Sequence, residues 1–273
     1  MATILTRQDI QQALRSLDLA SSPVCLHTSF RSFGSVAGGT VSLIDAFLRE
    51  HCTLLVPTFS WSFAVPPPPD QHFSRNGWNY TSYPGSTSGL GRIYTPQATE
   101  VDSDMGILAA AVVAHPDHLR GDHPLCSFSA LGHSATELIS AQRADDVYAP
   151  LTMLSKLNGF VLLIGVGLDK LTLLHLAEKQ AGRRLFRRWA NNLEGQPIAV
   201  EVGGCSAGFP KLEAELEPMT QTLGVGQSVW KLLPARPVLA CAIAAIRANP
   251  EITHCGEPTC ERCNDAIAGG PLL

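Results

Sequence analysis

The feature that most constrains the fold is an ordered alternation of apolar runs, a glycine-rich loop and a helical stretch near the N-terminus. Residues 23–27 and 53–59 are short apolar runs that predict two buried strands. Between them, residues 28–39 form a loop rich in glycine and serine, and Thr40 is the predicted N-cap of a helix over residues 41–48. A strand, a loop, a helix and a strand in this order predict an α/β layered sheet.

The composition is that of a globular protein with a sizeable core. Of 273 residues, 45% are hydrophobic and 16% are charged, so we expect residues 1–273 to form a single domain. A net charge of −4, without a long run of one sign, disfavours nucleic acid as a partner.

The N-terminus predicts an amphipathic helix capped by Thr6 rather than a signal peptide. No stretch reaches the roughly 18 apolar residues of a membrane span. We therefore expect a soluble, cytoplasmic protein with no membrane partner.

A third apolar run, residues 159–164, leads through a glycine-containing loop into a helix that carries His175 and Glu178. A step of three residues places both side chains on one face of that helix. An imidazole beside a carboxylate, near the end of a buried strand, is able to move protons. The same spacing also fits a structural histidine or two metal ligands, although no further ligand lies on this helix. The pair is the candidate catalytic centre, with a core histidine as the alternative.

The glycine-rich loop over residues 28–39 has the composition of an anion site. Its glycines allow sharp turns, its hydroxyl and N–H groups are donors, and Arg31 adds positive charge ahead of a helix N-terminus. It matches neither of the common glycine-rich nucleotide motifs. The loop therefore indicates a phosphate contact outside the ordinary nucleotide folds, and a tight strand-to-helix connection is the alternative.

Two further segments stand out from the strand and helix pattern. Residues 61–100 are long, irregular and rich in proline, and such a segment within a domain is more often functional than not. Residues 122–134 gather small and polar side chains around His123, and a structural loop is equally compatible with them. The sequence around Ser134 lacks the closing glycine of a hydrolase nucleophile turn, so we exclude that function.

The chain contains eight cysteines. Five lie in apolar contexts and are interpreted as buried, reduced thiols: Cys25, Cys52, Cys126, Cys205 and Cys241. The other three, Cys255, Cys260 and Cys263, lie with His254 in a cysteine-rich tail over residues 250–273, and three thiols with an imidazole are able to bind zinc. Adjacent ligands are awkward and a second C-x-x-C pair is missing, so the sequence does not favour structural zinc. We predict no metal in the active site, and no disulfide framework without a signal peptide.

Five blocks of this sequence, in the same order, resemble the aminoglycoside 3-N-acetyltransferase family, a group of antibiotic N-acetyltransferases distinct from the GNAT fold. The first block is similar to a family pattern of the type H-S-S-L-R-S-L-G-x-V-x-G-G. The blocks are residues 26–39 (LHTSFRSFGSVAGG), 55–61 (LVPTFSW), 104–108 (DMGIL), 123–132 (HPLCSFSALG), and 163–167 (LIGVG) together with 175–178 (HLAE). Each block alone is weak evidence, but five in series are specific.

The resemblance implies a three-layer α/β/α sandwich around a central mixed sheet, with an elaborated substrate-binding region and a possible acceptor-pocket insert around residues 61–100. It implies acetyl transfer from acetyl-CoA to an amine, with His175 as the general base and Glu178 as the nearest acid to orient it. Glu213 or Glu215 is the alternative orienting acid. The residues that the resemblance assigns to coenzyme binding are Ser29, Phe30, Arg31, Ser32, Val36, Met105, Ser127 and Phe128.

The acceptor that the resemblance implies is the 3-amino group of a 2-deoxystreptamine aminoglycoside, which is a polycation. Several carboxylates could receive it: Asp70, Asp102, Asp104, Asp122, Asp145 and Asp146. An arginine cluster after the helix of His175 carries the opposite charge and is interpreted as a solvated face or as attraction for CoA phosphates: Arg183, Arg184, Arg187 and Arg188. Two alternatives stay open, namely the same chemistry on another biosynthetic or metabolic amine, and a zinc-stabilised binding module with a vestigial CoA site. A homodimer is also left open.

Overall fold

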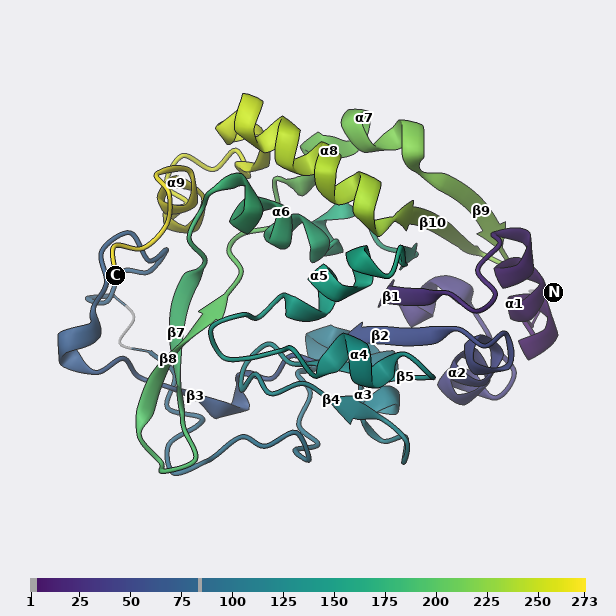
Figure 1. The fold of residues 1–273 in the computed structure, drawn as a ribbon, viewed down its shortest axis with the longest axis horizontal. Coiled ribbons are helices and arrows are strands. Elements are labelled where there is room, and N and C mark those ends of the chain that lie inside the picture. The colour runs from purple at the N-terminus through teal and green to yellow at the C-terminus, as the bar shows by residue number, and fades with distance from the viewer. Residues whose placement is uncertain (1–3, 83–84) are drawn as a thin grey trace.

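A seven-stranded mixed sheet forms the centre of this computed structural model, which describes residues 4–82 and 85–273 (Figure 1). Residues 1–3, and residues 83–84 of the predicted insert, lie outside the described residues. The strand order is β4-β5-β2-β1-β6-β10-β9. The strands are β1 (Pro23–Thr28), β2 (Thr53–Pro57), β4 (Leu119–Arg120), β5 (Phe128–Leu131), β6 (Phe160–Ile164), β9 (Gln221–Val225) and β10 (Ser228–Pro234).

Parallel and antiparallel pairs occur in this one sheet. β1 pairs in parallel with both β2 and β6, whereas β4, β5, β9 and β10 join through antiparallel pairs. The three parallel strands are the three apolar runs that the sequence predicts. The predicted central mixed sheet is confirmed, and its parallel centre places the loops after β1 and β6 at one edge.

Helices cover both faces of the sheet and create two separate cores. Along β6, Val161 and Leu163 belong to one core, and Leu162 and Ile164 belong to the other, because successive side chains of a strand point to opposite faces. The first core contains α4 (Ala135–Ile139), α5 (Ala149–Lys156), α6 (Leu173–Ala181), α7 (Glu213–Leu216) and α8 (Ala235–Ala248). The second contains α1 (Arg7–Ser16), α2 (Gly39–Arg49) and α3 (Gly106–Val113). The predicted three-layer α/β/α sandwich is confirmed.

A small second sheet accounts for much of the elaboration. β3 (Ala64–Val65), β7 (Phe186–Asn191) and β8 (Pro197–Val202) form an antiparallel sheet in the order β3-β7-β8, which lies beside the central sheet in Figure 1. The irregular region 61–100 supplies β3. The side-chain amide of Asn191 donates to the carbonyls of Gly89 and Arg92, so β7 also holds part of this region in place.

Of the two predicted helix N-caps, one is confirmed and one is wrong. Thr6 caps α1 in a full capping box with Asp9, as predicted. The prediction that Thr40 caps α2 is wrong, because the N-cap is Gly38 and the helix begins at Gly39. Gly38 has a left-handed φ of +76°, a conformation that favours glycine. Among the described residues, no helix is both long and apolar enough to cross a membrane.

Candidate active site

A cavity of about 860 Å³ lies where the loops after β1 and β6 meet the start of α6. Its walls include Arg31 from the glycine-rich loop, Met105 before α3, His175 on α6, and Gly203 and Gly204 in the loop after β8. The parallel pairing of β1 with β6 brings the first two of these loops together. The cavity therefore joins the predicted phosphate loop to the predicted proton-handling pair.

His175 and Glu178 lie side by side on α6, as their spacing predicts. The imidazole Nδ1 is 2.9 Å from Oε2 of Glu178, and both residues are buried. His175 lines the cavity, whereas Glu178 does not. With Nδ1 engaged by the carboxylate, Nε2 is the ring nitrogen left to exchange a proton with a bound molecule.

The second oxygen of Glu178 belongs to a buried network. Oε1 accepts from Nη1 of Arg183 at 2.6 Å and from the hydroxyl of Thr253 at 3.2 Å. Arg183 is only 8% exposed, so its interpretation as part of a solvated face is wrong. Glu213, the first of the two alternative orienting acids, instead pairs with Lys231 at 2.7 Å. Glu178 is thus the acid in contact with the histidine.

Aromatic side chains and a glycine fix the plane of the imidazole. Tyr148 stacks parallel to His175 with ring centroids 6.0 Å apart, and Phe209 meets the ring edge-on at 4.7 Å. A Cβ atom on Gly203 would lie 2.8 Å from Cδ2 of His175 and 2.4 Å from the hydroxyl of Tyr148. These groups come from remote segments, so no periodic signal in the sequence could have identified them.

The glycine-rich loop presents part of its predicted coenzyme contacts to the cavity. Ser29, Phe30 and Arg31 line the cavity, as does Met105 on the neighbouring segment. The side chain of Arg31 is exposed and has no hydrogen-bond or ion-pair partner among residues 4–82 and 85–273. The guanidinium is therefore available to an anionic ligand.

Ser32 and Val36 lie behind this wall rather than on it. The Ser32 hydroxyl is 2.7 Å from that of Ser228, and Val36 pairs with Leu5 in an isolated bridge. A Cβ atom on Gly165, which has a φ of +62°, would lie 2.2 Å from the side chain of Ser32. The loops after β1 and β6 therefore pack so closely that glycine is required at position 165.

Ser127 and Phe128 are part of the buried interior. The Ser127 hydroxyl accepts from Nε of Arg120 at 2.9 Å and donates to the carbonyl of Thr58 at 3.1 Å. Phe128 is fully buried and packs edge-on against Phe59, with ring centroids 5.6 Å apart. Neither lines the cavity, and both stabilise the strands that carry its walls.

Carboxylates reach the cavity from two loops. Asp104, one of the predicted acidic residues, lines it, and so does Asp169, which the sequence analysis did not single out. Asp102 acts indirectly, because its two oxygens accept from the backbone N–H of Trp61 at 3.1 and 2.9 Å, and Trp61 lines the cavity. Burial raises the pKa of the Asp102 carboxyl. Asp146 instead pairs with Lys179 at 3.1 Å.

The thiols near the cavity have the wrong protonation state for nucleophiles. Cys25 lies 3.8 Å from Nε2 of His27, but burial raises the pKa of this thiol and lowers the pKa of His27 to about 4. Burial also raises the pKa of Cys126, which lines the cavity. These cysteines and this histidine are therefore neutral near pH 7, and the thiolate that a covalent mechanism needs is disfavoured.

His123 is a structural residue. Its Nδ1 accepts from the backbone N–H of Cys126 at 2.8 Å, and its Nε2 donates to the carbonyl of Glu201 at 2.8 Å. Burial lowers the pKa of this imidazole to about 4. Both nitrogens are engaged in the neutral form, so the structural alternative is the correct one for His123.

Comparisons with known proteins agree with this geometry. The family profile described as aminoglycoside 3-N-acetyltransferase matches residues 25–247. Aminoglycoside N(3)-acetyltransferase IX of Micromonospora chalcea is 35% identical over 278 residues, which cover 90% of this chain and 94% of that protein.

The apoenzyme structure of aminoglycoside acetyltransferase AAC(3)-IVa matches with a TM-score of 0.77 and 25% identity, covering 98% and 99% of the two chains. The structure of AAC-IIIb as a binary complex with CoASH shares the fold, with a TM-score of 0.71 and 22% identity over 90% and 97% of the chains. The profile and the Micromonospora relative each span most of the sequence, so this chain belongs to the aminoglycoside 3-N-acetyltransferase family, as the five blocks predicted.

Proposed function

We propose that this protein transfers the acetyl group of acetyl-CoA to the 3-amino group of a 2-deoxystreptamine aminoglycoside and thereby confers antibiotic resistance. The observation that carries the proposal is a single cavity shared by His175, held through Nδ1 by Glu178, and the donor-rich loop at Ser29–Arg31. Family membership supplies the reaction type. The cavity supplies the residues that would perform it.

The chemistry assigned to His175 follows from its geometry. An amine attacks a thioester through its free lone pair and gives up a proton as the new C–N bond forms, and Nε2 of His175 accepts that proton. The carbon–sulfur bond of the thioester then breaks, and the CoA sulfur takes up the proton held by His175 and leaves as a thiol. Glu178 stabilises the transient imidazolium through Nδ1. This direct transfer is favoured over a covalent cysteine intermediate because the nearby thiols are held neutral by burial.

The glycine-rich loop is the proposed site for the anionic part of the coenzyme. Arg31 offers a charged fork for phosphate, and Ser29 adds a hydroxyl on the same wall. Phe30 and Met105 give the wall an apolar surface against which the pantetheine arm would pack. Ser32 and Val36 would support this wall from behind.

The acceptor is proposed to be a polycation because of the carboxylates in the cavity. Asp104 and Asp169 both line it, and each would attract an ammonium group of an amino sugar, which at Asp169 would compete with the ion pair to Lys170 at 3.5 Å. Trp61, held by Asp102, offers a ring surface in the same cavity. Another metabolic amine with several positive charges is the second candidate, because the same two carboxylates would attract it.

Release of the CoA thiol during incubation with acetyl-CoA and a panel of amines tests the proposal. The panel contains gentamicin, kanamycin, apramycin and non-sugar amines, and spectroscopy of the product locates the new amide. We expect acetylation of aminoglycosides at the 3-amino group. Inactivity on every aminoglycoside, together with turnover of another amine, would establish the second candidate instead.

The role of the histidine is tested separately. His175→Ala should lower kcat roughly 100- to 10,000-fold, while calorimetric binding of CoA is retained. His51→Asn is the matched control, since His51 is exposed and has a φ of +58°, which asparagine tolerates. Normal turnover by the His175→Ala variant would show that the proton is taken by another group.

A further inference from the structure

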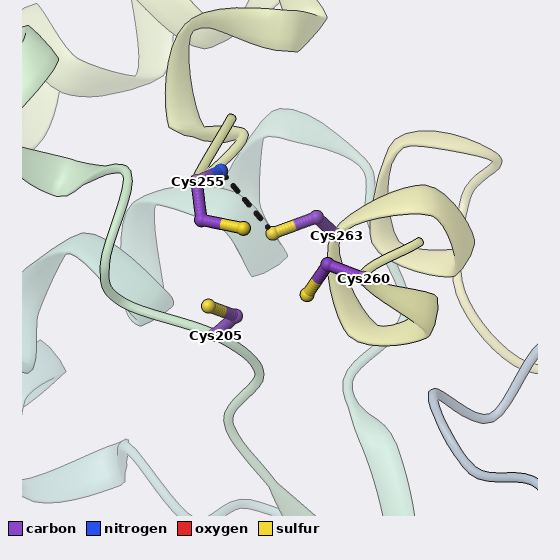
Figure 2. Close-up of side chains that lie close together, drawn as sticks. All are labelled: Cys205, Cys255, Cys260 and Cys263. Atoms are coloured by element: carbon purple, nitrogen blue, oxygen red, sulfur yellow. Dashed lines mark hydrogen bonds between the residues drawn. The ribbon is translucent and has the colours of Figure 1, made fainter. Parts of the chain in front are cut away.

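Four cysteines converge on one point outside the cavity. The sulfur atoms of Cys205, Cys255, Cys260 and Cys263 all lie within 4.8 Å of one another, and Figure 2 shows their side chains pointing toward a common centre. Cys205 follows β8, whereas the other three lie near the C-terminus: Cys255 precedes α9 (Glu261–Ile267), Cys260 is its N-cap and Cys263 lies within it. All four are free thiols.

The arrangement has the geometry of a closed metal site. A zinc ion bonded to four sulfurs at about 2.3 Å holds those sulfurs about 3.8 Å apart, so a small contraction of the observed cluster would complete a tetrahedron. The N–H of Cys255 also donates to Sγ of Cys263 at 3.4 Å, so a backbone donor reaches one of the four sulfurs.

We infer that Cys205, Cys255, Cys260 and Cys263 bind one structural Zn²⁺ ion. Four thiolates in a tetrahedron select zinc or a single iron among biological metals, and zinc needs no redox partner. A cluster of several irons would hold its sulfurs farther apart than these are. Four protein ligands leave no open position, so the ion has a structural role and takes no part in catalysis.

The fourth ligand differs from the one considered in the sequence. His254 is held by two other groups, because its Nδ1 accepts from the N–H of Gly256 at 2.9 Å and its Nε2 lies 3.1 Å from Oδ1 of Asn264. Cys205 occupies the fourth position instead. This choice removes the objection to adjacent ligands at positions 254 and 255 that made zinc unfavourable in the sequence.

The site ties together two segments that surround the catalytic histidine. Cys205 lies between Gly204 and Ser206, which both line the cavity. Thr253, two residues before Cys255, donates to Oε1 of Glu178. Zinc bound to both segments would fix the loop that packs against His175 and the hydroxyl that steadies its carboxylate.

Metal analysis of the full-length protein, purified without chelators, tests the inference. We expect about one zinc per chain, and Co²⁺ exchanged into the site should give the thiolate charge-transfer and intense visible bands of a tetrahedral sulfur site. Cys205→Ser and Cys260→Ser should lose the ion. Two controls should keep it: Cys241→Ser, which alters a partly buried thiol outside the cluster, and His254→Ala, which alters the excluded ligand.

Several results would overturn the inference. They are the absence of zinc from the wild-type protein after growth in added zinc, bound iron in its place, two disulfides found by alkylation and mass spectrometry, or unchanged zinc in Cys205→Ser. Should the serine variants fail to fold, the zinc content and cobalt spectrum of the wild-type protein decide the question. Thermal melting gives a further readout, because a chelator should lower the melting temperature of the wild-type protein but not that of a folded Cys205→Ser variant.

Discussion

Replacing Glu178 by glutamine changes the charge beside His175 with almost no change of shape. In the wild-type protein, Oε2 of Glu178 faces Nδ1 of His175 at 2.9 Å, and Oε1 receives Arg183 at 2.6 Å. An amide oxygen is still able to accept from Nδ1–H, so the tautomer is kept. The charge that stabilises the imidazolium is lost.

The structure sets the size of the effect. A hydrogen bond to a charged group contributes about 1.5–3 kcal/mol and a neutral one about 0.5–1.5 kcal/mol, so about 1–2 kcal/mol of transition-state stabilisation should disappear. We therefore expect Glu178→Gln to lower kcat roughly 5- to 30-fold. KM for acetyl-CoA should hardly change, since Glu178 does not line the cavity. Leaving Arg183 buried without its carboxylate should also cost about 3–5 kcal/mol of folding stability.

The assay is steady-state thiol release with saturating acetyl-CoA and an active aminoglycoside, measured well below the melting temperature of the variant. Circular dichroism and urea unfolding establish that the protein is folded and measure its loss of stability. Glu213→Gln is the matched control, because Glu213 pairs with Lys231 away from the cavity. An unchanged kcat in folded Glu178→Gln, or an equal loss in Glu213→Gln, would refute the assignment of Glu178 as the acid that orients His175.

Three other predictions test different parts of the site. Gly203→Ala should lower kcat roughly 100-fold by displacing the imidazole of His175, whereas Gly224→Ala, in a strand with open space around its Cβ position, should not. Arg31→Ala should raise KM for acetyl-CoA about tenfold and leave KM for the acceptor nearly unchanged, and an equal rise in both would contradict a phosphate contact. Burial lowers the pKa of His123 from 6.5 to about 4, so its contribution to stability is complete above pH 6.5 and is lost as the pH falls toward 4. Urea unfolding should therefore show that His123→Gln, although less stable at pH 7, loses ~2 kcal/mol less than the wild-type protein between pH 7 and pH 5, and identical losses would contradict the shift.

The parts of the fold that were predictable share one property, an uninterrupted apolar run. β1, β2 and β6 lie in the centre of the sheet, where both faces are covered, so nearly every position is apolar. In contrast, β7 carries charged residues, because it belongs to the small second sheet, and its Arg187 and Arg188 were interpreted as part of a solvated face or as attraction for CoA phosphates.

The site was predictable where it depends on spacing within one element. The contact between His175 and Glu178 follows from a three-residue step on a helix, and the exposure of Arg31 to the cavity follows from its place in a loop after a buried strand. Arg183 is five residues beyond Glu178, but Gly182, with a φ of +116°, ends the helix and redirects the chain. From the sequence, a charged residue just beyond the end of a helix is expected to be exposed. Arg183 is buried because it pairs with the buried carboxylate of Glu178.

The sequence alone therefore determined the layered architecture, the family, and the histidine with its adjacent acid, because each is recorded in local periodicity or in contiguous blocks. The tertiary structure decided which groups from distant segments surround the histidine and its acid, and which residue joins the C-terminal cysteines. Tyr148 and Phe209 fix the imidazole, Thr253 reaches Glu178, and Cys205 joins three cysteines from the end of the chain. These contacts depend on how strands and loops far apart in the sequence are brought together by burial of the two cores, and no local pattern carries that information.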